Sequence, residues 1–238
     1  RSVSRGLGDV YKRQILMRVL GIDTSTMIST VTVVEDEKII GDFNVNQEKT
    51  HSESLVPMIE TLLNLLGLKL SDIDIFAISQ GPGSFTGLRI GMTIAKTFAQ
   101  VGNKKLIPVS TLKALALNSS SNSFKASMLD ARGKRVYGAM YDENMNEIVK
   151  EDLYNIDDFS KLCNEKNVDF DLVSEVSEKY RDKFSRARIL DFSYNSCIGK
   201  NLCKLALLKK DEDYDLYKLV PNYLRKSQAE RDREKKND

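Results

Sequence analysis

The sequence predicts an α/β protein, and three observations support this fold class. Short segments rich in β-branched residues alternate with longer segments in which apolar residues recur three and four positions apart. Gly-rich and charged turns separate the two kinds of segment in the first half of the chain. Of the 238 residues 41% are hydrophobic and 29% are charged, with 13 Gly and 4 Pro, which excludes collagen-like, low-complexity and disordered chains.

The first three predicted elements are strands. Residues 17–24 and 28–34 carry the alternating β-branched and small residues typical of a pleated sheet. An acidic turn then leads into a third strand at 39–45. The short turns between these segments predict a meander.

Two amphipathic helices and two more strands follow. The apolar residues of 52–66 form a wide, leucine-rich stripe, and Gly67 ends this helix. A short apolar strand at 73–79 and a Gly-rich turn lead into a second helix at 84–101, after which 106–109 is again a strand. The resulting order β-β-β-α-β-α-β is that of the ribonuclease H-like fold.

A second lobe is expected after a boundary near Pro108, because the Asn- and Ser-rich stretch that follows has the composition of a connection. In this half we expect a short helix at 111–117 and strands at 124–129 and 136–141. A helix at 197–209 closes the pattern.

The expected organisation therefore has four parts. Residues 17–108 form the first lobe and residues 109–225 the second. Residues 1–16 are basic and without periodicity, and we expect an appended or mistranslated leader, with a natural flexible arm as the alternative. Residues 226–238 alternate charges without apolar anchors and are expected to form a mobile tail.

Charge and cysteine content narrow the function classes. The 36 Lys and Arg nearly balance the 34 Asp and Glu, and a net charge of +2 argues against a dedicated polyanion binder. Cys163, Cys197 and Cys203 are widely spaced and odd in number, which argues against a disulfide framework. No apolar run approaches the roughly 18 residues that cross a bilayer, and no secretory signal is evident. We therefore expect a cytoplasmic location and no membrane contact.

Asp23, Thr24 and Ser25 place an acid and two hydroxyls on the turn between the first two strands. Asp could hold a metal-bound water, and the hydroxyls could face a phosphate, so the turn is a candidate nucleotide corner. The alternative is that these side chains satisfy the backbone of the turn itself. The sequence leaves both interpretations open.

His51 is the only histidine, so a metal site with paired imidazoles is impossible within one chain. We expect His51 to be a polar neighbour of a helix start rather than a general base. A Ser-His-Asp arrangement would have to use this residue, and no Gly-x-Ser-x-Gly elbow is present. These observations disfavour a peptidase.

The Gly-rich segment 81–92 excludes a P-loop, because Leu88 and Arg89 stand where Gly-Lys-Ser would be required. If the helix is regular, four small residues spaced four apart form one flat ridge on it. Such a ridge lets another element approach closely. Packing against the protein's own sheet and packing against a partner's helix explain it equally well. The members of this ridge are Gly87, Gly91, Ala95 and Ala99.

The segments 20–26, 81–92, 130–137 and 221–225 resemble the TsaB (YeaZ) family, with Asp130, Ala131 and Arg132 followed by Val136 and Tyr137 in the third of them. The segment 81–92 is long and specific, whereas the others are individually weak. The resemblance extends from Met17 to about Arg225.

This resemblance implies a two-lobed fold of the sugar kinase/Hsp70/actin (ASKHA) type, with each lobe ribonuclease H-like and the second lobe reduced. It implies a role in making threonylcarbamoyladenosine at position 37 of tRNA. It also implies that the protein has no catalytic residue, metal or cofactor of its own. The implied partners are a TsaD-like catalytic subunit, a TsaE-like ATPase in the assembly and, when TsaD is absent, a second copy of the chain; tRNA is contacted only indirectly.

We therefore hypothesise a non-catalytic scaffold that binds TsaD through a bundle made by helices 52–66 and 84–101. On this hypothesis Gly91→Leu disrupts partner binding and leaves the fold intact. The rival is a small ATPase or kinase that uses Asp23 and the neighbouring hydroxyls. The expected interface residues are Leu55, Met58, Ile59, Leu62, Gly87, Gly91, Ala95 and Ala99.

Overall fold

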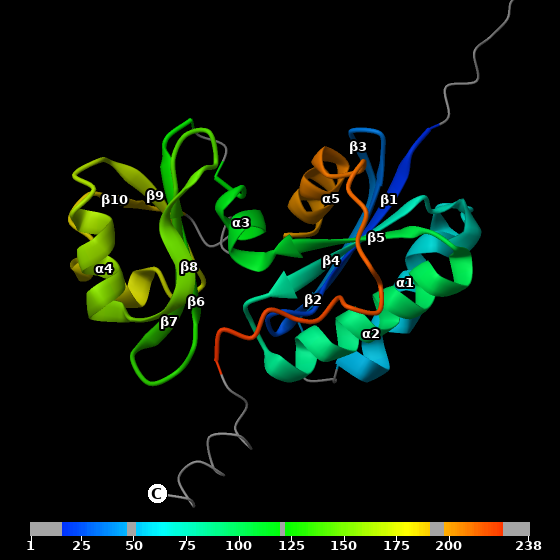
Figure 1. Cartoon of the computed structure of the whole chain (residues 1–238), viewed down its shortest axis with the longest axis horizontal. Helices are drawn as coiled ribbons and strands as arrows, with labels where there is room; N and C mark the ends of the chain where they lie inside the picture. The colour runs from blue at the N-terminus through cyan, green and yellow to red at the C-terminus, as the bar shows by residue number, and fades with distance from the viewer. Residues whose placement is uncertain (1–15, 47–50, 120–121, 191–197, 226–238) are drawn as a thin grey trace, which may run out of the picture.

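The structure is a computed structural model that describes residues 16–46, 51–119, 122–190 and 198–225. It has two lobes, each built on a five-stranded sheet (Figure 1). Most of the expected leader 1–16 and all of the expected tail 226–238 lie outside the described residues. None of the helices in the described part of the chain is long and apolar enough to cross a membrane.

The first sheet has the strand order β3-β2-β1-β4-β5. Neighbouring strands are antiparallel in the meander β1 to β3, and β4 and β5 continue the sheet in parallel with β1. The strands are β1 (Arg18–Asp23), β2 (Ile28–Glu35), β3 (Lys38–Asn46), β4 (Ile75–Gly81) and β5 (Lys105–Ser110). Each expected strand of this lobe is therefore present.

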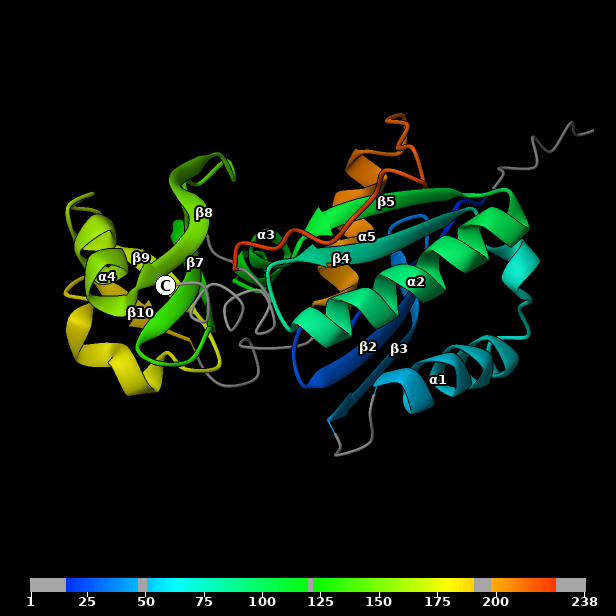
Figure 2. The same ribbon diagram turned by 60° about the horizontal axis from the view of Figure 1, so that its bottom comes forward.

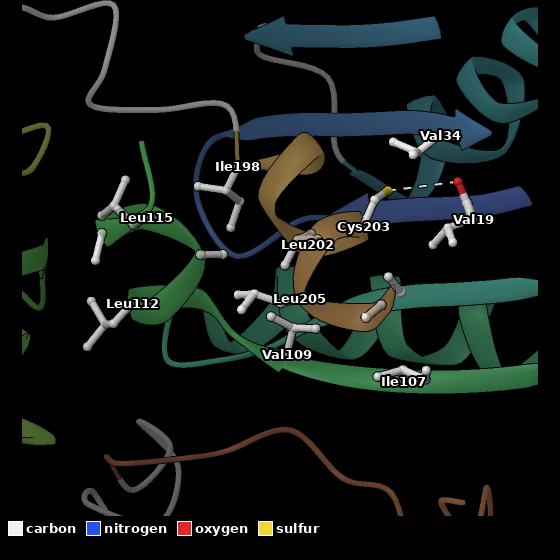
Figure 3. Close-up of a cluster of buried hydrophobic side chains, with 14 of the residues drawn as sticks. Val19, Val34, Ile107, Val109, Leu112, Leu115, Ile198, Leu202, Cys203 and Leu205 are labelled. Carbon is white, nitrogen blue, oxygen red and sulfur yellow. Dashed lines mark hydrogen bonds between the residues drawn. The ribbon is translucent and has the colours of Figure 1, made fainter. Parts of the chain in front are cut away.

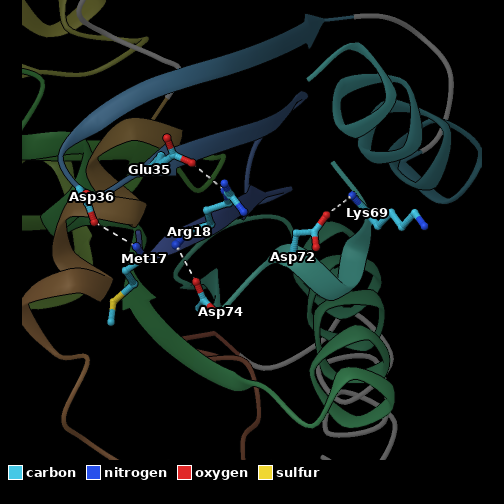
Figure 4. A network of polar contacts seen from close by, with 7 residues as sticks. All are labelled: Met17, Arg18, Glu35, Asp36, Lys69, Asp72 and Asp74. Atoms are coloured by element: carbon cyan, nitrogen blue, oxygen red, sulfur yellow. Dashed lines mark hydrogen bonds and ion pairs between the residues drawn. The ribbon is translucent and has the colours of Figure 1, made fainter. Parts of the chain in front are cut away.

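Polar contacts hold the start of β1 in place (Figure 4). The backbone N–H of Arg18 donates to Asp74 Oδ2 at 2.9 Å, and its guanidinium pairs with Glu35 at 2.7 Å. The backbone N–H of Met17 donates to Asp36 Oδ1 at 3.0 Å. A separate bond from the Lys69 N–H to an Asp72 carboxylate oxygen closes the short 3-10 helix η1 (Leu70–Asp72).

Helices α1 (His51–Leu65) and α2 (Phe85–Gly102) lie side by side on one face of the first sheet (Figure 2). The Ser84 hydroxyl caps α2 by accepting the Gly87 N–H, and Asn103 ends it in the left-handed conformation. Because side chains alternate across a strand, Leu20 and Ile22 of β1 face this helix pair. The other face of the same sheet also carries apolar residues, among them Val19 and Ile107, which another element must bury.

The second sheet has the order β10-β9-β6-β7-β8, which repeats the topology of the first. One face packs on α4 (Ile156–Asn164) and the 3-10 helix η2 (Glu178–Lys183), and the other on α3 (Thr111–Ala116). A short 3-10 helix stands where the first lobe has α2, which is the reduction expected for this lobe. Its strands are β6 (Phe124–Asp130), β7 (Arg135–Tyr141), β8 (Glu147–Asn155), β9 (Phe170–Val173) and β10 (Ala187–Ile189).

The last helix, α5 (Gly199–Leu208), covers the open face of the first sheet rather than the second lobe (Figure 3). Cys203 Sγ lies 3.8 Å from the Val19 carbonyl oxygen, and Leu202 packs in the same core cluster. Leu219 is buried in the core beneath α1 and α2. The expected second lobe, 109–225, is thus corrected at α5 and Leu219, because these parts of the chain pack on the first sheet.

Candidate functional site

The turn that follows β1 is a buried polar corner. Asp23 is 3% exposed, and one of its carboxylate oxygens accepts the Ser25 N–H at 2.9 Å. Burial raises the pKa of the Asp23 carboxyl. The hydrogen bond from the Ser25 N–H acts in the opposite direction by favouring the carboxylate.

Thr24 and Ser25 join this turn to the loop that precedes α2. The Thr24 hydroxyl donates to the Gly87 carbonyl at 2.8 Å, and the Ser25 carbonyl accepts the Ser84 N–H at 2.7 Å. Gly83 lies so close that a Cβ there would stand 2.4 Å from the Ser25 carbonyl oxygen. The polar groups of Thr24 and the Ser25 backbone are therefore engaged by the protein itself.

His51 also contributes to the corner through both ring nitrogens. Nδ1 lies 2.7 Å from the Ser29 hydroxyl, and Nε2 lies 2.9 Å from the Thr26 carbonyl oxygen. A carbonyl only accepts hydrogen bonds, so Nε2 carries a proton and, in the neutral ring, Nδ1 accepts from Ser29. His51 is the first residue of α1, so it ties the helix start to the turn.

The four residues of the glycine and alanine ridge face the protein's own sheet. A Cβ at Gly91 would stand 2.3 Å from Thr24 Oγ1 and 3.2 Å from Ile78 Cδ1. Ala95 and Ala99 are fully buried in the same core cluster. The expectation that this ridge meets a partner is therefore wrong, because the small residues let α2 lie against β1 and β4. The expectation that Gly91→Leu leaves the fold intact fails for the same reason.

The leucine-rich stripe of α1 is also interior. Leu55, Ile59 and Leu62 are each at most 2% exposed, and Met58 is 8% exposed. They pack with residues of β1 and β2 in one core cluster. These four residues therefore hold α1 on the sheet and are not available to a partner.

The outward sides of α1 and α2 carry apolar residues that the sequence analysis did not select. Val56 is 42% exposed and Leu65 71% on α1, and Val101 is 80% exposed on α2. Leu65 and Val101 each lie at the end of their helix. A signal was present in the sequence, because Val56 and Leu65 fall outside the three-and-four spacing of the buried stripe.

Within the described ranges, no group of three or more His, Cys, Asp or Glu side chains is placed to hold a metal ion. Cys163 and Cys203 are buried free thiols. Burial raises the pKa of Cys163 to about 12 and also raises that of Cys203.

Two lobes with the same β3-β2-β1-β4-β5 type of sheet define the class of two-lobed α/β proteins to which sugar kinases and actin-like ATPases belong. Solved structures agree. The fold is similar to that of YeaZ from Pseudomonas aeruginosa, with a TM-score of 0.74 at 23% identity over 87% of this chain and 99% of that one. It is also similar to a ROK hexokinase from Thermus thermophilus, with a TM-score of 0.50 at 10% identity over 82% of this chain and 100% of that one.

Sequence comparison identifies the family. Residues 38–205 match the family model described as "TsaD: tRNA N6-adenosine threonylcarbamoyltransferase". The chain is 27% identical to the tRNA threonylcarbamoyladenosine biosynthesis protein TsaB of Bacillus subtilis over 90% of this chain and 96% of that one. The TsaB of Escherichia coli is 36% identical over 56% of this chain and 58% of that one. The chain belongs to this family and, within it, to the TsaB (YeaZ) proteins of tRNA threonylcarbamoyladenosine biosynthesis.

Proposed function

We propose that the protein is a non-catalytic subunit of the machinery that makes threonylcarbamoyladenosine at position 37 of tRNA, and that it binds a TsaD-like catalytic subunit. A TsaE-like ATPase joins this assembly, and a second copy of the chain takes the TsaD place when TsaD is absent. The protein contacts tRNA only indirectly and works in the cytoplasm. The match to the TsaD family model and the names of the curated relatives support this proposal.

The observation that carries the non-catalytic part is the closed packing of the polar corner. Thr24 is fully buried, its hydroxyl bonds Gly87, and the carbonyl of Ser25 bonds Ser84. Asp23 is buried with a raised pKa, and both ring nitrogens of His51 are in contact with acceptor or hydroxyl groups. These contacts commit Thr24, His51 and the Ser25 backbone to the junction of β1, α1 and α2.

The partner surface that we propose is the outward side of the α1 and α2 pair. It presents Val56, Leu65 and Val101 to solvent, and removing such side chains from water favours association. The eight interface residues expected from the sequence are interior, so a helix bundle with a partner would use the opposite side of α1 and α2. The proposed interface therefore still lies on α1 and α2, but its residues are Val56, Leu65 and Val101.

A reconstitution experiment tests the proposed function. Threonylcarbamoyl transfer to tRNA is measured with a TsaD-like and a TsaE-like protein, with and without this chain. We expect transfer to fall strongly when the chain is omitted. Undiminished transfer would refute an accessory role.

Two matched variants test the proposed surface. Leu65→Arg places a charge at the end of α1, and Leu208→Arg places the same charge at the end of α5, where Leu208 is 75% exposed. We expect Leu65→Arg to weaken TsaD binding at least tenfold by calorimetry and Leu208→Arg to leave it unchanged. Equal affinities for the two variants would place the interface elsewhere.

The rival function, a small ATPase or kinase, makes the opposite prediction. ATP turnover by the isolated chain that is lost in Asp23→Ala would support it. We expect no such turnover, because the Asp23 carboxyl is 3% exposed and lies beneath the turn that it stabilises.

A further inference from the structure

After α5 the chain runs along the first lobe as a segment without helix or strand, residues 214–225, which turns at 216–218 and which we term the C-terminal strap. The strap begins near the start of β5, where Lys105 pairs with Asp213 at 3.0 Å. It then follows α2, where the Gln100 amide and the Tyr217 hydroxyl lie 3.4 Å apart. Figures 1 and 2 show this red segment crossing the first lobe and ending beside the second.

The strap is bonded to the carboxyl end of β4. The Asn222 N–H donates to the Gln80 carbonyl at 2.7 Å, and the Gln80 side-chain amide donates to the Val220 carbonyl at 3.0 Å. A Cβ at Gly81 would stand 2.9 Å from the Asn222 carbonyl oxygen, so the two backbones are in direct contact. In α/β sheets the crevice outside the carboxyl ends of the strands is where ligands bind. The strap occupies that position at β4.

An aromatic contact fixes the strap on the first turn of α2. The rings of Phe85 and Tyr223 stack with centroids 4.5 Å apart. The Arg89 guanidinium lies 4.3 Å from the centre of the Phe85 ring, and its Nε donates to the Tyr223 hydroxyl at 2.9 Å. This contact involves the first lobe only.

Two further bonds reach the second lobe. The Asn222 amide donates to one carboxylate oxygen of Glu151, on β8, at 3.1 Å, and the Ser110 hydroxyl at the end of β5 donates to the other oxygen. The Arg225 guanidinium donates to the Ala131 carbonyl at 2.6 Å. Glu151 therefore receives one bond from the first sheet and one from the strap.

We infer that the C-terminal strap is an intramolecular plug of the crevice at the carboxyl end of β4, and that Glu151 is the latch that holds it there. Opening the crevice requires the strap to leave Gln80 and Glu151 together, because Asn222 bonds the first through its backbone and the second through its side chain. Leu219 anchors the start of the strap in the core beneath α1 and α2, so the release concerns residues 220–225 and leaves that core intact. This inference is independent of the proposed function.

Hydrogen–deuterium exchange of the full chain tests the latch. Asn222→Ala removes only the amide that reaches Glu151, and Glu151→Ala removes the acceptor for both donors. Because a hydrogen bond to a charged group is lost, we expect exchange in residues 219–225 to become about tenfold faster in each variant, with β1 and β2 unchanged. Glu165→Ala, an exposed acid on the second lobe, serves as the control and should leave strap exchange unaltered.

Two results would overturn the inference. One is unaltered exchange of the strap in Asn222→Ala, the variant that leaves both sheets untouched. The other is an equal acceleration across β1, β2 and the strap, since that pattern would report general destabilisation instead of local release.

Discussion

The Thr24 hydroxyl donates to the Gly87 carbonyl at 2.8 Å, and a Cβ on Gly87 would stand only 2.0 Å from the carbonyl oxygen of Thr24 itself. The turn after β1 and the first turn of α2 are thus bonded and in backbone contact at one point. Any side chain at Gly87 must separate them. This relationship explains why glycine is present inside a helix, where it is otherwise unfavourable by about 1 kcal/mol relative to Ala.

Gly87→Ala is expected to lower the free energy of unfolding by at least about 2 kcal/mol, because overpacking at a rigid backbone outweighs the gain in helix propensity. Urea unfolding followed by circular dichroism measures the change. Gly102→Ala, at the other end of α2, is the matched control, since its Cβ would meet only the flexible Lys104 side chain at 3.2 Å. Equal stability of the two variants would contradict the packing that we describe.

Asp23→Asn should become progressively more stable than the natural protein as pH rises above about 4, the ordinary pKa of an unfolded Asp. Burial raises the folded-state pKa of Asp23, so the natural protein loses stability as pH rises from the unfolded pKa through the folded one. The Asn side chain still has an oxygen to accept the Ser25 N–H and carries no charge. Unfolding free energies measured at several pH values check this, and a pH-independent difference between the two proteins would refute it.

Cys163 and Cys203 should resist alkylation in the folded protein at neutral pH. Both are buried, and with a pKa of about 12 for Cys163 and a raised pKa for Cys203 the reactive thiolate is scarce. Iodoacetamide treatment followed by peptide mass spectrometry reads each position separately. Urea-unfolded protein is the positive control, and rapid native labelling of either residue would show that its burial is wrong.

A fragment of residues 17–108 should not unfold cooperatively by itself. It lacks α5, so the face of the first sheet that carries Val19, Ile107 and Val109 would lie open to water. Residues 16–225 form the comparison and should give one sharp thermal transition. A sharp transition for the short fragment would mean that the first lobe ends near Pro108 after all.

The elements of the first lobe could be predicted because the spacing of apolar residues within each one is a local signal. The stripe of α1 and the order of five strands depend on neighbours a few positions apart. The location of α5 could not be predicted in this way. Its sequence shows an apolar side, but nothing local says whether β1 or a strand of the second lobe lies beneath it.

In the candidate site, too, the local pattern could be predicted from the sequence and the long-range contacts could not. The small-residue ridge was identified correctly as a place of close approach, and the sequence left open which element approaches. The approaching element is the end of β1, because a Cβ at Gly91 would stand 2.3 Å from Thr24 Oγ1, and Thr24 is far from Gly91 in the sequence. The contacts of Asn222 with Gln80 and Glu151 join positions that are farther apart in the sequence than Thr24 and Gly91 are. Such contacts leave no periodic pattern in the sequence from which they could be predicted.

The place of α5 on the first sheet also bears on how the chain is made. Residues 124–189, which include every strand of the second sheet, leave the ribosome before the helix that completes the first lobe. At about 5 to 20 residues per second, several seconds separate the synthesis of β5 from that of α5. During that interval the apolar residues of β1 and β5 that α5 covers in the finished structure have no cover, so the nascent chain offers chaperones an apolar surface that the finished protein hides.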